Sequence, residues 1–154
     1  GVVINYTSVY GNTKKAVELL ADELINLGCP KVAVNDLARC DTAEAVEDTF
    51  RYGKAVFATT TYNGEVFPFM RDFLNNLTER NYQNRTIGII ENGTWTPVAA
   101  RTIKKAFENS KNLTFTETTV TSHSAGKEEN LTQIKALAKE LVELVKEKRL
   151  IHKK

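Results

Sequence analysis

The chain has 154 residues, 42% of them hydrophobic and 26% charged, and its 21 Lys and Arg against 19 Asp and Glu give a formal net charge of +2. This length supports one hydrophobic core and leaves no room for a second domain, and the balanced charge argues against nucleic acid as a partner. No apolar run reaches the roughly 18 residues of a membrane span and no signal peptide is evident, so we expect a cytoplasmic chain without membrane contact. The few cysteines and histidines do not suggest a metal centre, so we expect no metal.

Short apolar runs alternate with longer amphipathic stretches along the chain, and this alternation predicts repeated strand–helix units. The first strand, Val2 to Tyr6, is almost continuously apolar, which is typical of parallel strands buried on both faces. The first helix begins near Asn12 and stops at Gly28, a residue that readily takes the left-handed conformation beyond a helix end. Its expected buried stripe consists of Val17, Leu20, Leu24 and Leu27.

The next three units follow the same pattern. The second has a strand at Lys31 to Leu37 and a helix that opens at Asp41 with a capping-box spacing. The third has a strand at Ala55 to Thr59, and the fourth has a strand at Thr86 to Ile90 with a helix from near Pro97, where a proline costs no hydrogen bond. Apolar spacing predicts the inward residues of the second and third helices: Ala43, Val46 and Phe50, then Val66, Met70, Phe73, Leu74 and Leu77.

The fifth unit has a strand at Leu113 to Val120 and a helix with a buried stripe of Leu131, Ile134, Leu137, Leu141 and Val145. Five units predict an α/β fold with a doubly wound, five-stranded parallel sheet in the order 2-1-3-4-5, since a barrel needs eight units. Residues 1–148 form this domain, and residues 149–154 form a basic C-terminal tail. About thirty residues per unit leave no length for a long insertion in the fifth strand, which predicts the short form of the fold.

Ligands of such a sheet bind outside the carboxyl ends of the strands, where the winding reverses, so the loops after the first, third and fourth strands are candidate binding loops. The first loop, Thr7 to Thr13, runs directly into a helix whose free N–H groups and dipole attract anions, and Ser8, Asn12 and Thr13 add donors. The loop lacks the glycine pattern of a dinucleotide fingerprint and the Gly-Lys-Ser/Thr of a P-loop. A phosphate site is one interpretation, and a simple helix cap by Ser8 or Thr13 is the other.

The second and third loops each carry an aromatic residue. Thr59 to Glu65 places Tyr62 beside an Asn63-Gly64 turn signal, and Glu91 to Pro97 holds the only tryptophan, Trp95. Such aromatics can cover a flat heterocycle, although a surface tyrosine and a tryptophan packed on a helix are the alternative. A phosphate loop and two aromatics at one edge together predict a site for a phosphorylated planar cofactor.

The segment Tyr6-Thr7-Ser8-Val9-Tyr10-Gly11-Asn12-Thr13 resembles the phosphate loop of flavodoxins, and its Ser-x-Tyr-Gly-Asn-Thr form is most similar to the flavodoxin-like domain of flavodiiron proteins, also called A-type flavoproteins. The Thr-Tyr-Asn-Gly of the second loop and Trp95 are similar to the isoalloxazine-binding loops of that family. The resemblance covers essentially the whole chain but only the C-terminal domain of a full flavodiiron protein. Two features depart from the family: Thr59-Thr60-Thr61 stands where a proline often precedes the aromatic, and the third loop has fewer small residues.

The resemblance implies FMN as the cofactor. It places the phosphate against Ser8, Val9, Tyr10, Gly11, Asn12 and Thr13. It places one side of the ring against Thr59, Thr60, Thr61, Tyr62, Asn63 and Gly64, and the other side against Asn92, Gly93, Thr94, Trp95 and Thr96. Glu65 and Glu91 border these loops, and a carboxylate close to the ring would lower its reduction potential.

The function that follows is electron transfer through FMN, with no residue of the chain acting as a catalyst. The resemblance implies a redox partner protein or a fused diiron domain, and the oligomeric state stays open. The net charge of +2 favours a module delivered to its partner by a covalent link, since free flavodoxins are typically acidic. Three alternatives remain: an NAD(P)H-dependent FMN reductase, a flavin-free assembly or signalling domain, and a receiver domain, which the threonines at 59–61 disfavour because it needs a phosphoacceptor Asp there.

Overall fold

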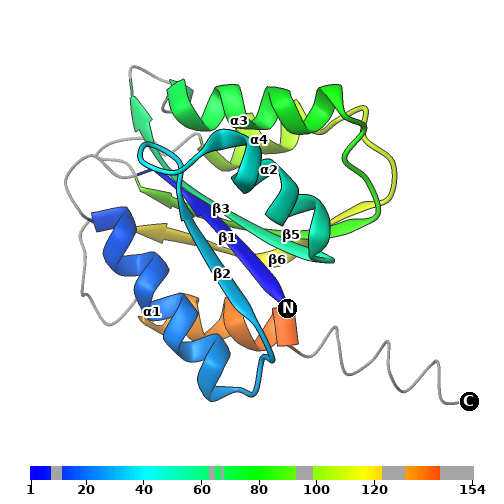
Figure 1. The fold of residues 1–154 in the computed structure, drawn as a ribbon. Helices are drawn as coiled ribbons and strands as arrows, with labels where there is room; N and C mark the ends of the chain where they lie inside the picture. The colour runs from blue at the N-terminus through cyan, green and yellow to red at the C-terminus, as the bar shows by residue number, and fades with distance from the viewer. Residues whose placement is uncertain (8–11, 63–64, 67, 93–98, 123–130, 143–154) are drawn as a thin grey trace, which may run out of the picture.

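The computed structural model describes residues 1–7, 12–62, 65–66, 68–92, 99–122 and 131–142. A central sheet lies between two layers of helices (Figure 1). Its strands are β1 (Val2–Tyr6), β2 (Val32–Asp36), β3 (Lys54–Tyr62), β4 (Glu65–Val66), β5 (Arg85–Asn92) and β6 (Leu113–Ser122). Parallel pairing gives the order β2-β1-β3-β5-β6, and β4 pairs antiparallel with β3. The parallel strands thus follow the doubly wound order 2-1-3-4-5, and the predicted fold class is confirmed.

Helices cover both faces of this sheet. They are α1 (Asn12–Asn26), α2 (Thr42–Arg51), α3 (Pro68–Glu79), α4 (Ala99–Ala106) and a C-terminal helix over residues 131–142. On one face lie α2, α3 and α4, and on the other lie α1 and the C-terminal helix (Figure 1). Residues 143–154, which include Val145 and the expected boundary after residue 148, lie outside the described residues.

Each face of the sheet has its own hydrophobic core, because successive strand residues point to opposite faces. On β3, Phe57 packs into the core under α2, α3 and α4, whereas Val56 packs into the core under α1 and the C-terminal helix. The Phe57 ring lies 6.4 Å from that of Phe73 and 5.7 Å from that of Phe107, between centroids. Full burial of one such side chain contributes about 1.5–3 kcal/mol, so these cores fix the helix layers on the sheet.

The first helix, α1, matches its prediction except at its end. Val17, Leu20 and Leu24 are fully buried. Gly28 has a φ of 90°, and the Cys29 backbone N–H donates to the Leu24 carbonyl at 2.9 Å, so the helix stops where expected. The prediction for Leu27 is wrong: its side chain is 38% exposed because the residue lies beyond the last helical position and has left the buried stripe.

The second helix, α2, is capped by Asp41, whose Oδ1 accepts the Ala43 backbone N–H at 2.8 Å. The prediction that Ala43 faces inward is wrong, because the cap starts the helix in a rotation that buries Ala45 and exposes Ala43. Thr49 also faces the sheet. Its hydroxyl donates to the Ala45 carbonyl at 2.7 Å and accepts from Asn5 Nδ2 at 2.9 Å, so this buried polar pair is satisfied.

The third unit contains a short additional strand. At the end of β3, Tyr62 lies opposite Glu65 and Thr61 opposite Val66, which places Val66 on β4. The prediction that Val66 belongs to the following helix is therefore wrong. The chain enters α3 only at Pro68, since a proline lacks the backbone donor of a helix interior but fits the first turn. The rest of the predicted stripe is buried: Met70, Phe73, Leu74 and Leu77.

The last strand, β6, contains a bulge in place of a long insertion. Phe115 lies opposite Ile87, but Thr119 lies opposite Ile89, so the register shifts between these pairs. Glu140 of the C-terminal helix accepts the backbone N–H groups in the bulge, from Glu117 at 2.5 Å and from Thr118 at 3.1 Å. The short form of the fold is thus confirmed, with the bulge held by a carboxylate.

The C-terminal helix is held to the sheet by packing and by one buried cation. Leu137 approaches β5 so closely that a Cβ on Gly88 would lie 3.0 Å from Leu137 Cδ1, which explains the glycine there. The Lys54 ammonium, buried at the start of β3, donates to the Leu141 carbonyl. The stripe residues Ile134, Leu137 and Leu141 are buried as predicted.

Candidate functional site

The carboxyl ends of the parallel strands bring polar residues side by side at one edge of the sheet. Register places Thr59 of β3, Glu91 of β5 and Thr121 of β6 in one row. The next row outward consists of Thr60, Asn92 and Ser122. Helix α1 begins at the same edge, because it follows β1 directly. This is the edge at which doubly wound sheets bind ligands.

A pair of hydroxyls joins β1 to β3 at this edge. Thr7, which follows β1, and Thr59 are both fully buried, and their Oγ1 atoms lie 2.7 Å apart. The Thr59 hydroxyl also donates to the Thr60 carbonyl at 3.3 Å, and the Thr7 backbone N–H donates to the Ala58 carbonyl at 3.0 Å. The Thr59 hydroxyl is therefore satisfied by the protein itself.

The next hydroxyl along β3 is not satisfied in this way. Thr60 Oγ1 is buried and has no hydrogen-bond partner among the described residues. Because side chains alternate along a strand, Thr60 shares its face with Val56 and Ala58, which belong to the core under α1. A buried hydroxyl without a partner costs about 1–3 kcal/mol, so this position favours a ligand that accepts or donates a hydrogen bond.

The start of α1 supplies a second feature suited to an anion. Thr13 in its first turn is buried, and the first turn contains no acidic residue. Lys14 and Lys15, which follow, are exposed. Free N–H groups and the positive end of the helix dipole attract negative charge, and no carboxylate of the first turn competes for them. The arrangement suits a phosphate.

Part of the predicted site falls on the described residues: Asn12, Thr13, Thr59, Thr60, Thr61, Tyr62 and Asn92. Four of these lie on strands and not in loops, because β3 extends to Tyr62 and β5 to Asn92: Thr60, Thr61, Tyr62 and Asn92. The other predicted residues lie outside the described part of the chain: Ser8, Val9, Tyr10, Gly11, Asn63, Gly64, Gly93, Thr94, Trp95 and Thr96.

Two residues at this edge were missed by the sequence reasoning. Thr121 donates its hydroxyl to Glu91 Oε1 at 3.2 Å. Asp36, the last residue of β2, accepts the Tyr6 hydroxyl at 3.3 Å on Oδ2. Burial raises the pKa of Tyr6, and the Asp36 carboxylate raises it further, so the phenol stays protonated. Asp36 is the last residue of β2 and Thr121 the last but one of β6, and this place near a strand end was the signal available in the sequence.

Within the residues that the structure describes, no three His, Cys, Asp or Glu side chains gather as a metal site. No helix within the same residues has the length and apolarity needed to cross a bilayer. Among the described residues, the carboxyl edge offers buried threonine hydroxyls, the buried Glu91 carboxylate and the first backbone N–H groups of α1. Groups of these kinds can bind and orient a polar ligand.

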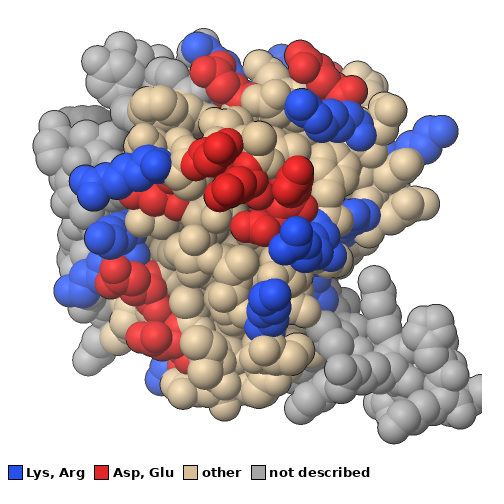
Figure 2. Space-filling view, viewed as in Figure 1, with Lys and Arg blue, Asp and Glu red and all other residues tan. Residues whose placement is uncertain are grey.

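The near-balanced charge of the chain is unevenly spread over its surface. Figure 2 shows acidic side chains gathered over the face that carries α2. This helix contributes Glu44, Glu47 and Asp48, and its Arg51 lies 3.3 Å from Asp48. Helix α4, in the same layer, carries only basic charges: Arg101, Lys104 and Lys105. Within this layer, α2 is therefore predominantly acidic and α4 is basic.

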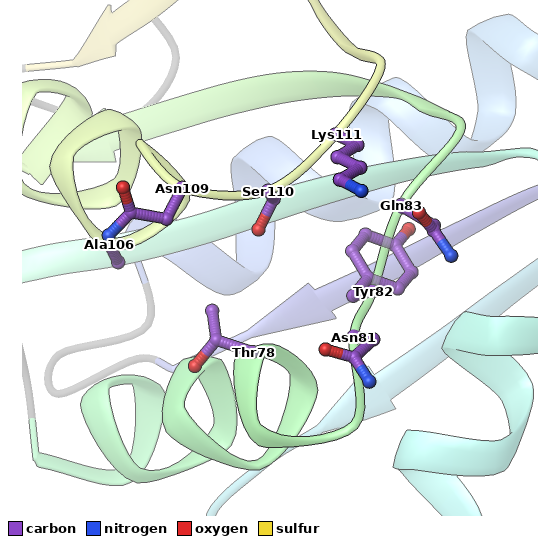
Figure 3. Close-up of a pocket in the computed structure, with 8 residues that line it drawn as sticks. All are labelled: Thr78, Asn81, Tyr82, Gln83, Ala106, Asn109, Ser110 and Lys111. Atoms are coloured by element: carbon purple, nitrogen blue, oxygen red, sulfur yellow. The ribbon is translucent and has the colours of Figure 1, made fainter.

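A cavity of about 620 Å³ lies at the opposite edge of the sheet, before β5 and β6 begin (Figure 3). It is lined by the ends of α3 and α4 and the segments after them: Thr78, Asn81, Tyr82, Gln83, Ala106, Asn109, Ser110 and Lys111. Tyr82 is 0% exposed, and its hydroxyl has no partner among the described residues. Burial raises the pKa of Tyr82, so this phenol is neutral at physiological pH. The carboxyl edge, with its helix start and threonines, remains the candidate functional site.

Comparison with known proteins identifies the same architecture. A flavodoxin-domain family model matches residues 3–149. A search of curated proteins finds no significant match. Rubredoxin oxygen:oxidoreductase from Desulfovibrio gigas superposes with a TM-score of 0.88 at 20% identity, over 96% of this chain and 36% of that protein. The Flv1 flavodiiron core from Synechocystis has a TM-score of 0.82 at 17% identity, over 95% of this chain and 36% of that one.

A free-standing protein also shares the fold. A flavodoxin from the domain Archaea superposes with a TM-score of 0.79 at 17% identity, over 94% of this chain and 98% of that one. The chain thus spans 36% of the Desulfovibrio and Synechocystis proteins but almost all of the archaeal one. At these identities the likeness shows the fold alone.

Proposed function

Because this chain belongs to the flavodoxin-domain family, we propose that it is an FMN-binding domain that transfers electrons. FMN, when bound, supplies a ring that takes up and releases electrons singly or in pairs. The chain supplies the binding groups, holds the ring in place and sets its potential through hydrogen bonds and local charge. No side chain needs to act as an acid, a base or a nucleophile in such a transfer.

The Thr60 hydroxyl is the observation that supports this proposal most strongly. It is buried and has no partner among the residues that the structure describes, on the face of the sheet that α1 covers and at the edge where α1 begins. A phosphorylated ligand seated at the start of α1 would bring acceptor oxygens to this edge. FMN phosphate or its ribityl chain would supply a hydrogen-bond partner that the described part of the chain does not provide for this hydroxyl.

The family resemblance supports the remaining contacts of this proposal. We propose that residues 8–13 hold the phosphate, with Thr13 at the buried side of α1. Residues 59–64 and 92–96 hold the two sides of the ring. Thr59 has a supporting role in this arrangement, because its hydroxyl binds Thr7 and the Thr60 carbonyl and so fixes the end of β3.

The electron acceptor is either a separate redox protein or a diiron domain of a longer polypeptide. The chain spans 36% of the Desulfovibrio and Synechocystis proteins, which are an oxygen oxidoreductase and a flavodiiron core. The acidic side chains over α2 suit a partner with a basic surface, because complementary charge speeds encounter.

The test is an FMN titration of the purified chain, followed by quenching of flavin fluorescence, with matched threonine variants. Thr60→Val keeps the side-chain shape and removes the unpartnered hydroxyl. We expect FMN affinity to fall about tenfold, while the free energy of unfolding of the FMN-free chain stays equal or rises. Thr114→Val makes the same change at an exposed position on β6, away from the carboxyl edge, and should leave FMN affinity unchanged.

The outcomes separate the competing functions. Wild-type chain that fails to quench FMN contradicts the proposal and favours a flavin-free assembly or signalling domain. Wild-type chain that binds FMN and oxidises NADPH by itself favours the reductase. Equal FMN affinity in wild type and Thr60→Val would remove Thr60 from the site.

A further inference from the structure

Glu91 is a buried carboxylate with both oxygens engaged at the carboxyl edge. The residue is 7% exposed. Its Oε2 accepts the Ala100 backbone N–H at 2.7 Å, and its Oε1 accepts the Thr121 hydroxyl at 3.2 Å. Ala100 lies in the first turn of α4, so the carboxylate also faces the positive end of that helix. A buried carboxylate is tolerated only with partners of this kind.

These contacts connect three separate chain positions around one side chain. Glu91 itself precedes the last residue of β5, Ala100 is the second residue of α4, and Thr121 precedes the last residue of β6. Cross-strand register already places Glu91 beside Thr121, and the bond to Ala100 adds the start of α4 to this pair. One carboxylate therefore ties the start of α4 to the paired ends of β5 and β6.

We propose that Glu91 is a positioning residue for the flavin ring. It acts through Ala100 and Thr121, because it holds the start of α4 and the end of β6 at a fixed distance from the end of β5. The inference rests on the proposed function, since the ring is expected at these strand ends. It assigns Glu91 a geometric role and not the role of a free charge beside the ring, because both carboxylate oxygens are occupied by protein donors.

Geometry and charge can be separated at this position. In Glu91→Gln, the amide oxygen can still accept from Ala100 N–H, and the amide nitrogen can donate to the Thr121 hydroxyl. This variant keeps both contacts and removes the charge. Glu91→Ala removes both contacts and the charge, and Thr121→Val removes only one contact.

The chain also offers a matched control. Glu140 is a second carboxylate that accepts backbone N–H groups, from Glu117 and Thr118 in the β6 bulge, away from the strand ends. Glu140→Ala therefore repeats the chemical change of Glu91→Ala without touching the carboxyl edge.

The experiment measures FMN dissociation constants by fluorescence titration, the midpoint potential of the bound FMN, and amide hydrogen exchange of the FMN-free chain. We expect Glu91→Ala to weaken FMN binding about tenfold, Thr121→Val to weaken it less, and Glu91→Gln and Glu140→Ala to stay within about threefold of wild type. We expect the Ala100 amide to exchange faster in Glu91→Ala only, and the Glu117 and Thr118 amides to exchange faster in Glu140→Ala only.

Two results would overturn the positioning role. Wild-type FMN affinity in Glu91→Ala would show that the ring does not depend on this carboxylate. Equal loss of affinity in Glu91→Gln and Glu91→Ala, with equal shifts in midpoint potential, would show that charge and not geometry matters. A wild-type chain that binds no FMN overturns the proposed function itself, and with it the flavin part of this inference. The Ala100 exchange rate then decides whether Glu91 holds the start of α4.

Discussion

Thr7 and Thr59 join the ends of β1 and β3 through buried hydroxyls whose oxygen atoms lie 2.7 Å apart. The two residues are 52 positions apart in the sequence, so this bond closes a long segment of chain at the candidate site. It fixes the strand end from which Thr60 presents its unpartnered hydroxyl.

We expect Thr59→Val to lower the free energy of unfolding by about 1–3 kcal/mol, because it leaves the buried Thr7 hydroxyl without this partner. The double variant Thr7→Val and Thr59→Val should lose less than the sum of the single variants, since neither unpaired hydroxyl then remains. Urea unfolding of the FMN-free chain measures both. Additive losses would mean that the two hydroxyls do not interact.

Tyr82→Phe removes a buried hydroxyl that has no partner among the described residues and keeps the ring. That ring packs edge-on against Phe50 at 5.2 Å and lies 5.9 Å from Phe107, and both contacts persist in the variant. We expect the free energy of unfolding to rise by about 1 kcal/mol. A loss of stability in urea unfolding would reveal a partner for the hydroxyl, such as a water molecule in the adjoining cavity.

Alkaline pH should destabilise the folded chain through ionisation of Tyr82. Burial raises the pKa of Tyr82 in the folded state above the ordinary value of about 10. The stabilising contribution of the neutral phenol is therefore complete below about pH 10 and is lost as the pH rises further. Urea unfolding at neutral pH and above pH 10 should show a smaller alkaline loss in Tyr82→Phe than in wild type. Equal losses would assign the alkaline transition to other groups.

Arg85 fastens the end of α2 to the start of β5. Its Nε donates to the Tyr52 carbonyl at 2.9 Å, and its Nη2 donates to the Phe50 carbonyl at 2.7 Å. A lysine keeps the charge but cannot make both hydrogen bonds at once with the same geometry. We therefore expect Arg85→Lys to lower the free energy of unfolding by about 1–3 kcal/mol.

The control for this change is Arg51→Lys. Arg51 makes an exposed ion pair with Asp48, and such pairs contribute little, so the control should lose less than about 0.5 kcal/mol. Thermal unfolding of both variants against wild type measures the difference. Equal losses of stability in the two variants would show that the paired hydrogen bonds of Arg85 add nothing beyond its charge.

The strand order was predictable because strong local signals mark it. β1 is almost continuously apolar, and Asp41 and Gly28 mark a helix start and a helix stop. The sequence did not predict every residue of α2 that faces the sheet. Thr49 is polar, so the apolar pattern of the helix assigns it to the surface. It is buried through a hydrogen bond to Asn5, which no local pattern reveals.

The same limit applies to the candidate site. The threonines after Thr59 looked like a loop because the apolar run ends there, yet β3 continues through pairing of Thr60 with Asn92 of β5. Pairing between distant segments extends a strand beyond its own apolar pattern. The contacts of Glu91 to Ala100 and Thr121 depend on that register and on the start of α4, so the sequence showed only that Glu91 borders a candidate binding loop.

The bulge in β6 also bears on aggregation. An outer strand with a continuous row of free backbone groups can recruit a strand from another chain. β6 lies at one end of the sheet, and its ladder is broken where Glu140 already binds the Glu117 and Thr118 N–H groups. β2, at the other end, is only 5 residues long. Both outer strands are therefore poor templates for edge-to-edge association.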